Sequence, residues 1–446
     1  MRRIDGLVPR PDWERIVRDE GLTYALTERP DGRRFSYWNE TAAYVLSPAE
    51  VEELESTTDE LHRMCAEAAR YLATGALGTL GLSQDAFELA QHSLRLREPS
   101  IYGRFDLAWD GTGPAKMLEL NGDTPTGLVE GAICQWSRVE AMFPGLGGEH
   151  APFDQLNGLW PMLVERWRQR LPFSASKTLH VAYTREEESG EDAANAAVLA
   201  NTAVEAGYRA VLLPVEDVRF DTRSRSWVHA TGDVDSPAVV GPIEEIFALH
   251  PWENLVDDGP GAFVLEDPTL MHHWYEPAWK MFCSNKLLLV ALWRCFPGHE
   301  NLLPAYADGP GDLAEWVRKP VFGREGDGIE ISARNVQVRS ADPHPSPLEV
   351  WQAYTPIRNF PGSDGAPNHP VVGSWVVGED GAAGIGIRES DGPLTDYWCR
   401  SVPNIIDKEG TLRPPTCSPG RSPRPPPRSS GRPRSPRCTR PWSRWG

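Results

Sequence analysis

The stretch IYGRFDLAWDGTGPAKMLELNGDTPTG, residues 101–127, contains two runs in which apolar and polar side chains alternate. A period of two residues predicts one strand over residues 102–109 and a second over residues 116–121. The segment between them, DGTGP at residues 110–114, is rich in residues that form turns. The sequence therefore predicts a β-hairpin.

Polar side chains gather on one face of this predicted hairpin. Arg104 and Asp106 share a face of the first strand, since side chains on one face recur every second residue. Met117, Glu119 and Asn121 share a face of the second strand in the same way. If the strands pair, two carboxylates and an amide oxygen converge beside an arginine, and such hard ligands suit Mg²⁺. The alternative is a solvated face whose charges pair only with one another.

Length, charge and cysteine content limit the class of protein. The chain has 446 residues, enough for two or three domains. Its formal net charge of −18 argues against nucleic-acid binding and would suit a cationic ligand. No apolar run approaches the roughly 18 residues of a membrane span, and the first residues lack the apolar core of a signal peptide. The seven cysteines form no CxxC pair, which is typical of a reducing cytoplasm.

Two helix starts flank the hairpin in the sequence. Residues 1–100 are predicted to be mainly helical, with Ser47 as the N-cap and Pro48 at the first position of a long helix. After the hairpin, Thr124 and the proline that follows it are predicted to open another helix. Asp123 and Thr124 are either an ordinary cap, which we favour, or part of a substrate pocket.

Residues 151–245 are predicted to form a βαβ unit. The pattern gives a strand over residues 178–183, a helix over 192–207 and a strand over 208–214. This alternation predicts parallel strands, with ligands bound near their carboxyl ends.

The loop TREEESGED, residues 184–192, lies at that edge and is strongly acidic. A solvated loop is the favoured interpretation. In the alternative, Glu188, Glu191 and Asp192 hold an ammonium group.

The segment WVRKPVFGREGDGIEI, residues 316–331, predicts a strand, a glycine-rich loop and a second strand. A P-loop would run into a helix instead, so this segment is not one. Gly323, Gly326 and Gly328 would let the backbone approach phosphates, and Lys319 could reach the same phosphates. The alternative is a flexible hairpin tip without a ligand.

Three further segments offer contacts to a nucleotide. Lys286 precedes an apolar helix at residues 287–293 and is either a solvated flank or a phosphate ligand. The strand VWQAY, residues 350–354, could form the hinge beside a nucleotide base. Arg388 ends a strand and could meet a transferring phosphoryl group, or form a surface salt bridge.

The final segment, residues 407–446, is rich in Arg, Pro and Ser and has ten basic residues against two acidic ones. It has almost no apolar residues and cannot form a packed core, so we expect disorder. One hypothesis is a shifted reading frame. A basic arm that binds an acidic partner is the alternative.

Several stretches together resemble the glutathionylspermidine synthase family, in its stand-alone synthetase form with an ATP-grasp fold. The resemblance spans about residues 30–406 in the family's order. The stretches are YGRFDLAWD, KMLELNGDTPT, HPWENLVDD, EPAWKMFCSNKLLLVALW, FPGHENLLPAY, VRKPVFGREGDGIEI and GIGIRESDGPLTDYWCRSVPNII.

The resemblance implies an α/β (α+β) fold of the ATP-grasp type, with a pre-ATP-grasp domain and a glycine-rich lid hairpin. Residues 1–406 would form the synthetase body. Within it, about 150–245 would be an inserted substrate region and about 280–406 the ATP-binding lid and core. No N-terminal amidase domain like that of bifunctional members is present, so a hydrolytic half-reaction is not expected.

The resemblance also implies an ATP-dependent carboxylate–amine ligase that forms an amide through an acyl phosphate and releases ADP and phosphate. ATP and Mg²⁺ would be required. The partners would be a peptide-like or glutathione-like acid and a polyamine-like amine, in the cytoplasm, with a homodimer as one option. The implied metal ligands are Asp106, Glu119 and Asn121. Arg104 and Arg388 would contact the transferring phosphate or the intermediate. The implied nucleotide contacts are Lys286, Lys319, Gly323, Gly326, Gly328, Gln352 and Tyr354.

Two other classes stay open on sequence alone. One is a nucleotide-binding regulatory or scaffold protein of the same fold without catalysis. The other is a glycosidase-like hydrolase that uses paired carboxylates.

Overall fold

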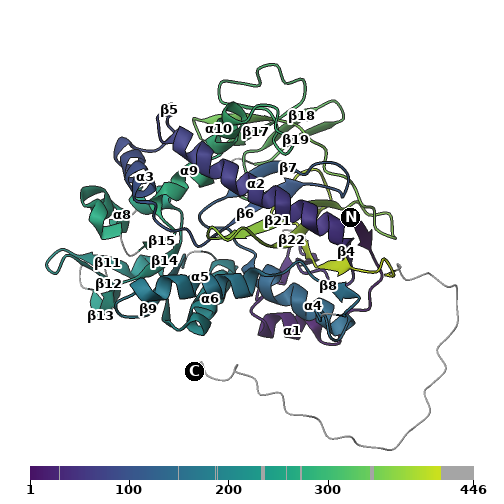
Figure 1. The fold of residues 1–446 in the computed structure, drawn as a ribbon, viewed down its shortest axis with the longest axis horizontal. Helices are drawn as coiled ribbons and strands as arrows, with labels where there is room; N and C mark the ends of the chain where they lie inside the picture. Colours follow the sequence, from purple (N-terminus) through teal and green to yellow (C-terminus); the bar gives the residue numbers. More distant parts are fainter. Residues whose placement is uncertain are drawn as a thin grey trace, which may run out of the picture. The chain divides into compact units, whose positions relative to one another are not determined.

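A five-stranded sheet in the order β23-β22-β21-β6-β7 lies at the centre of the structure (Figure 1). The computed structural model describes residues 1–412 except 30, 149, 186, 188, 233–236, 258, 272, 273 and 342–345. Every neighbouring pair in this sheet is antiparallel. The strands are β6 (Tyr102–Ala108), β7 (Lys116–Asn121), β21 (His369–Val377), β22 (Ala382–Ser390) and β23 (Arg400–Val402).

The predicted hairpin is confirmed as β6 and β7. Their register pairs Asp106 with Glu119, and it is interrupted by a β-bulge between Asp106 and Leu107. Leu107 then pairs with Met117, so one residue of β7, Leu118, has no partner in the register.

The bulge overturns one expectation about β7. Met117 was expected on the face of Glu119, but it is fully buried in the core with Phe105 and Leu107. Leu118 turns to the opposite face and lines a cavity together with Glu119. Two consecutive residues of β7 therefore face the cavity.

Helix α2 (Pro48–Leu72) lies across this sheet and packs on β21 and β22 (Figure 1). The Ser47 side chain accepts the Glu50 N–H, and the Glu50 carboxylate accepts the Ser47 N–H at 2.7 Å. This capping box confirms the predicted start of the helix. Buried side chains of α2 such as Leu54 and Leu61 share one core with Phe105.

A second sheet, in the order β16-β20-β17-β18-β19, carries the glycine-rich segment. β17 and β18 pair antiparallel, so the predicted strand, loop and strand are confirmed. Two side chains join this sheet to β7, because Lys319 Nζ donates to the Leu118 carbonyl at 2.8 Å and Gln352 Nε2 to the Met117 carbonyl at 3.0 Å. The strands are β16 (Ala305–Tyr306), β17 (Trp316–Pro320), β18 (Glu330–Ala333), β19 (Val336–Arg339) and β20 (Glu349–Ala353).

The predicted βαβ unit is confirmed within a third sheet, ordered β10-β9-β14-β15. β9 pairs in parallel with both β10 and β14, and helix α6 connects β9 to β10. The acidic loop lies between β9 and α6, as expected. The elements are β9 (Thr178–Tyr183), α6 (Glu191–Ala206), β10 (Arg209–Pro214), β14 (Ile246–Leu249) and β15 (Trp274–Tyr275).

The remaining elements belong to the same compact unit, Met1–Pro414. The strands are β1 (Arg2–Ile4), β2 (Leu26–Glu28), β3 (Arg34–Ser36), β4 (Ala43–Leu46), β5 (Ala76–Thr79), β8 (Phe153–Asp154), β11 (Val218–Asp221), β12 (Ser226–Thr231), β13 (Ala238–Ile243) and β24 (Asn404–Asp407). The α-helices and the π-helix are α1 (Trp13–Asp19), α3 (Gln84–Leu96), a π-helix (Glu130–Cys134), α4 (Gln135–Met142), α5 (Leu159–Arg170), α7 (Trp252–Asp257), α8 (Gly259–Glu266), α9 (Met281–Ser284) and α10 (Leu287–Cys295). Short 3-10 helices span Leu171–Phe173, Val215–Asp217, Pro268–Met271 and Ala278–Lys280. None of the helices in the described ranges has the length and apolarity that crossing a bilayer requires.

One predicted boundary moves. The tail was expected to begin at Asp407, but this residue ends β24, and its carboxylate accepts the N–H groups of Thr411 and Leu412 at 3.1 and 2.9 Å. The expectations of disorder and of a shifted frame at residues 413–446 lie outside the described residues. The division of the body into substrate and ATP-binding regions stays a prediction.

A buried ion pair anchors the start of β6. Glu276 Oε1 accepts the N–H groups of Ile101 and Tyr102 at 2.9 and 2.8 Å. Lys280 Nζ lies 3.2 Å from Glu276 Oε2 and donates to the carbonyls of Tyr102 and Gly122. The pair therefore fixes β6 at its first residue and the backbone just after β7.

We expect Lys280→Met to lower the free energy of unfolding by about 3 kcal/mol, because it leaves the buried Glu276 carboxylate without its cation. Urea denaturation measures this. The double variant Lys280→Met/Glu276→Gln should recover a large part of the loss, since it leaves no unpaired charge. A single variant as stable as the parent would show that the ion pair does not anchor the hairpin.

Candidate functional site

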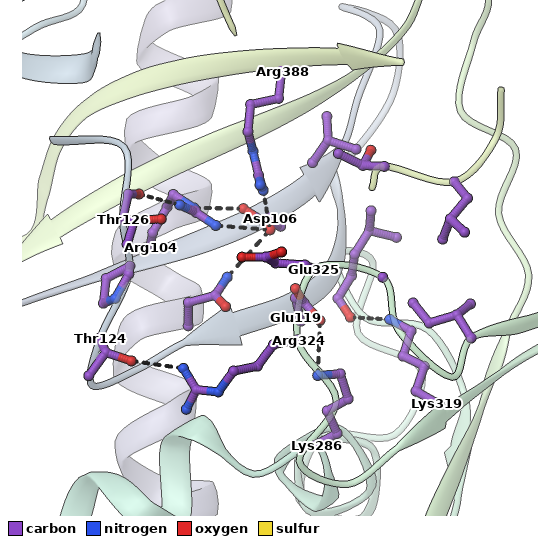
Figure 2. Close-up of a pocket in the computed structure, with 18 of the residues that line it drawn as sticks. Arg104, Asp106, Glu119, Thr124, Thr126, Lys286, Lys319, Arg324, Glu325 and Arg388 are labelled. Carbon is purple, nitrogen blue, oxygen red and sulfur yellow. Dashed lines mark hydrogen bonds and ion pairs between the residues drawn. The ribbon is translucent and has the colours of Figure 1, made fainter. Parts of the chain in front are cut away.

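A cavity of about 440 Å³ lies between the central sheet and the sheet that contains β17 and β20 (Figure 2). All the predicted site residues line it except Gly323 and Gly328. Those on its walls are Arg104, Asp106, Glu119, Asn121, Lys286, Lys319, Gly326, Gln352, Tyr354 and Arg388. The fold thus brings candidates from distant parts of the sequence to one cavity.

Asp106 is the point at which three of these side chains meet. Arg104 Nε donates to its Oδ1 at 2.9 Å, and Arg388 Nη2 donates to its Oδ2 at 2.6 Å (Figure 2). Asn121 Nδ2 lies 3.3 Å from the same Oδ2. Burial works to raise the pKa of the Asp106 carboxyl, but the charges of Arg104 and Arg388 outweigh it and lower the pKa to about 2. Asp106 is therefore an anion at neutral pH, and Arg388 pairs with a buried acid instead of a surface one.

Glu119 lies across the hairpin from Asp106 and faces two lysines. Lys286 Nζ lies 3.5 Å from Glu119 Oε2. Burial would raise the pKa of Glu119, but the charges of Lys286 and Lys319 outweigh it and lower the pKa. Lys319 itself is only 5% exposed, and burial lowers its pKa to about 8. Positive and negative groups therefore alternate along this wall.

The oxygen set predicted for a divalent cation is present on the same wall. Asp106 and Glu119 occupy paired positions, and Asn121 lies on the same strand as Glu119. Rotating the Asn121 amide by half a turn would exchange its NH₂ for its oxygen at the same position. Within the described ranges, no three or more His, Cys, Asp or Glu side chains form a group that could hold a metal ion. Two ionised carboxylates and an amide oxygen fit Mg²⁺, with the remaining ligands left to water or substrate oxygens.

Of the glycines predicted as site residues in the glycine-rich loop, Gly326 lines the cavity, and Gly323 and Gly328 make backbone hydrogen bonds that hold the loop. Gly326 is on the cavity wall with a φ of +80°, a conformation that favours glycine, and a Cβ there would lie 2.9 Å from the Thr395 carbonyl oxygen. The carbonyl of Gly323 accepts a hydrogen bond from Lys286 Nζ. The Gly328 N–H donates to the Ala341 carbonyl at 2.7 Å. The loop is therefore tied both to a cavity lysine and to the segment that directly follows β19.

Arg324 is a cavity residue that sequence reasoning missed. Its Nη1 donates to Thr124 Oγ1 at 3.0 Å, and its Nη2 donates to Glu253 Oε1 at 3.1 Å (Figure 2). As the one arginine in the loop FGREGDG, it carried a usable signal. The favoured interpretation of Thr124 as a helix cap is wrong, because Thr124 lines the cavity and the first helical residue is Leu128, directly before the π-helix Glu130–Cys134.

Gln352 lies near the end of β20, and Tyr354 is the first residue after this strand. Gln352 is 2% exposed, and its amide is used by the hydrogen bond to the Met117 carbonyl. Tyr354 lines the cavity, and burial raises its pKa. A role of this strand as a nucleotide hinge stays a prediction.

The acidic loop contributes a wall of opposite charge. Glu187 and Asp192 line the cavity. Burial, with the neighbouring charge of Glu187, raises the pKa of Asp192 to about 6, and burial with Glu130 raises the pKa of Glu191 to about 8. The interpretation of the loop as solvated is therefore wrong at Glu191 and Asp192. Glu188, which was grouped with them, lies outside the described residues.

A mixed α/β fold whose cavity combines arginines, lysines and paired carboxylates is typical of an enzyme that acts on anionic small molecules. Comparison with known proteins makes this specific. Residues 5–407 match the family described as "Glutathionylspermidine synthase preATP-grasp". The chain belongs to this family, and its ATP-grasp type of fold is thereby confirmed.

Individual relatives agree with the family. The chain is 34% identical over 414 residues to a "Putative acid--amine ligase" of Haemophilus influenzae, covering 91% of this chain and 100% of that protein. It is 25% identical over 336 residues to trypanothione synthetase of Crithidia fasciculata, covering 70% of this chain and 48% of that protein. The match to the bifunctional glutathionylspermidine synthetase/amidase of Escherichia coli is 24% over 324 residues, covering 66% of this chain and again 48% of the relative. The chain spans about half the length of these last two proteins, and it is an enzyme of the C–N ligase kind.

We expect Asp192→Asn to raise the free energy of unfolding at pH 8 by about 2 kcal/mol and to leave it nearly unchanged at pH 4. The pKa of Asp192 in the folded state is about 6, above its ordinary value of 3.8. Ionised Asp192 therefore destabilises the fold when the pH exceeds both of these pKa values. Urea denaturation at the two pH values measures this. Glu205→Gln, at the exposed end of the same helix, keeps an oxygen that can accept from Trp160 Nε1 and should have little effect at either pH. A variant that is less stable at pH 8 would mean that the carboxylate makes a favourable contact there.

Proposed function

We propose that this enzyme joins a small-molecule carboxylic acid to an amine at the expense of ATP, through an acyl phosphate, with release of ADP and phosphate. The observation that supports this most directly is the convergence of Arg104, Arg388, Lys286 and Lys319 on the two carboxylates of one hairpin. The names of the relatives support an acid–amine ligase in general terms.

The basic residues meet the main obstacle to this reaction. ATP and a carboxylate are both anions and repel each other, so their approach requires compensating positive charge. Lys286 and Lys319 lie beside Glu119 and would bind nucleotide phosphates. Arg104 and Arg388 lie beside Asp106 and would bind the acid and the transferring phosphoryl group.

Asp106, Glu119 and Asn121 would hold Mg²⁺ on the same wall. When bound, the ion would neutralise charge on the transferring phosphoryl group and orient its oxygens. The low pKa of Asp106 and the lowered pKa of Glu119 keep both groups ionised without it.

The lid hairpin would exclude water from the acyl phosphate, which water would otherwise hydrolyse. Arg324 supports this role because it joins the loop to Thr124, which lines the cavity, and to Glu253 of α7. With the bond from Lys286 to the Gly323 carbonyl, these contacts tie the loop to other segments around the cavity.

The substrates are an acid of the peptide or glutathione kind and an amine of the polyamine kind, by analogy with the names of the relatives. The acidic wall at Glu187 and Asp192 suits the cationic amine. We place the reaction in the cytoplasm, consistent with the free thiols of Cys65, Cys134 and Cys283. A homodimer remains a prediction.

A direct test is ADP release from ATP and Mg²⁺ over a panel of small peptides, including glutathione, combined with polyamines. We expect ADP only when an acid and an amine are both present, loss of the signal in EDTA and its return with added Mg²⁺. If nucleotide binds but no combination releases ADP, the non-catalytic nucleotide-binding alternative is favoured.

Asp106→Asn should lower kcat for ADP release by at least about 100-fold, the usual size for one preorganised charged group in such a site. It also leaves Arg104 and Arg388 without their anion, so folding is checked by circular dichroism at the assay temperature. Asp110→Asn is the matched control, since Asp110 lies in the turn of the same hairpin and pairs with exposed Arg358. Unchanged turnover in the Asp106 variant would remove Asp106 from the mechanism.

A further inference from the structure

The loop that joins β22 to β23, residues 391–399, is a surface that the lid hairpin contacts. Pro393, Leu394 and Thr395 of this loop line the cavity of about 440 Å³, called the main cavity below. The lid residue Gly326 lies directly against the loop, because a Cβ there would be 2.9 Å from the Thr395 carbonyl oxygen and 3.6 Å from Leu394 Cδ1. This loop, called the lid seat below, therefore has to keep its place if the lid is to fit closely.

Arg400, the first residue of β23, ties together the two ends of the lid seat. Its Nη1 donates to Oδ1 of Asp391, the first residue of the loop, at 2.7 Å. Its Nε donates to Glu389 Oε1 on β22 at 3.4 Å, and its Nη2 donates to Asn368 Oδ1 at 3.1 Å. Since Arg400 directly follows the loop, one guanidinium group closes the loop at its base.

Glu389 gives Arg400 a fixed point of attachment. Its carboxylate is fully buried and accepts from Arg3 Nε and Nη2 at 2.7 and 2.9 Å and from the Tyr44 hydroxyl at 3.0 Å. Side chains alternate along a strand, so Glu389 lies on the face of β22 opposite to Arg388, which lines the main cavity. Because Arg3 remains as its partner, Glu389 is not left as an unpaired buried charge when Arg400 is replaced.

The ion pair of Arg400 with Asp391 acts on the position of the loop more than on the stability of the fold. The Asp391 side chain is 60% exposed, and ion pairs in contact with water contribute little to the free energy of unfolding. The pair nevertheless restricts the conformations that are open to the first residue of a loop without regular structure. Its main effect is therefore on where the cavity end of the loop lies.

We propose that Arg400 is a positioning residue for the lid, because it holds Thr395 of the lid seat in the place where Gly326 packs. This rests on the proposed ligase function, in which the lid keeps water from the acyl phosphate. When the lid seat moves, water adds to the acyl carbon and the bond from that carbon to the phosphate oxygen breaks. One proton of the water stays on the phosphate and the other passes to solvent, so ATP is consumed and the free acid returns without an amide.

The test measures ADP and amide together, on the full chain with ATP, Mg²⁺ and the acid–amine pair that gives the highest ADP release. Arg400→Met removes all three hydrogen bonds and keeps an unbranched side chain. We expect it to release at least about three ADP per amide, against about one in the parent, because water then reaches the intermediate. Asp391→Ala removes only the bond to the loop, at an exposed residue, and should raise the same ratio. A parental ratio in both variants overturns the proposal.

Arg225→Met is the matched control. Arg225 Nη2 lies 2.6 Å from Asp267 Oδ2, so the variant removes an ion pair of nearly the same length, and neither residue lines the main cavity. It should leave the ratio of ADP to amide unchanged. An equal rise in Arg225→Met would make the effect a general result of losing an ion pair, which overturns the proposal.

Hydrogen exchange separates this proposal from the proposed function, because it needs no substrate. We expect the backbone amides of residues 322–328 in the lid to exchange at least about threefold faster in Arg400→Met than in Arg225→Met, and those of β6 to exchange equally in both. This result supports Arg400 as a positioning residue even where no substrate pair releases ADP. Equal exchange of the lid in the two variants overturns the proposal. Equal acceleration of the lid and β6 would make Arg400 a structural residue and overturns it as well.

Discussion

The contact of Asp106 with two guanidinium groups is the constraint on which the rest of the site depends. Arg104 comes from the same strand and Arg388 from β22, so the contact exists only when β6, β21 and β22 are in register. Removing three charged groups from water is costly unless each finds a partner. Together with Glu119, Lys286 and Lys319, the cluster keeps more positive than negative groups. Its excess charge faces the cavity, where it would attract phosphates and carboxylates.

Local patterns in the sequence predicted much of this arrangement. The alternation in residues 101–127 gave both strands, because each buries one face against the core below. The same pattern failed at Met117, since a bulge in the pairing of the two strands shifts the register by one residue, and a period-two pattern carries no signal for an inserted residue. The shift matters for function, because it puts Leu118 and Glu119 on the cavity wall together.

Patterns within one segment could not predict contacts between distant segments. The helix expected at Thr124 begins only at Leu128, and the freed segment supplies the hydroxyl that holds Arg324 of the lid. Nothing near Tyr24 in the sequence indicates that its hydroxyl meets Glu130 on the far side of the central hairpin. The family resemblance indicated more of the candidate site residues than residue spacing did. Motifs in a fixed order encode tertiary contacts that single segments do not.

The main cavity carries cations on one wall and the acids of the β9–α6 loop on another, and this gives the proposed reaction an order in space. Phosphates and the acid would be drawn to the arginines and lysines, and the amine to Glu187 and Asp192, so like charges stay apart until the reacting groups meet. The cost is carried by the protein without substrate, since burial and the neighbouring charge of Glu187 disfavour the ionised form of Asp192. A ligand that binds only the folded state stabilises it, so the amine would return part of that free energy on binding. Binding sites often contain charges that are unfavourable without a ligand, whereas a structural core pairs its charges. The buried Glu276–Lys280 ion pair, outside the cavity, is an example of such pairing.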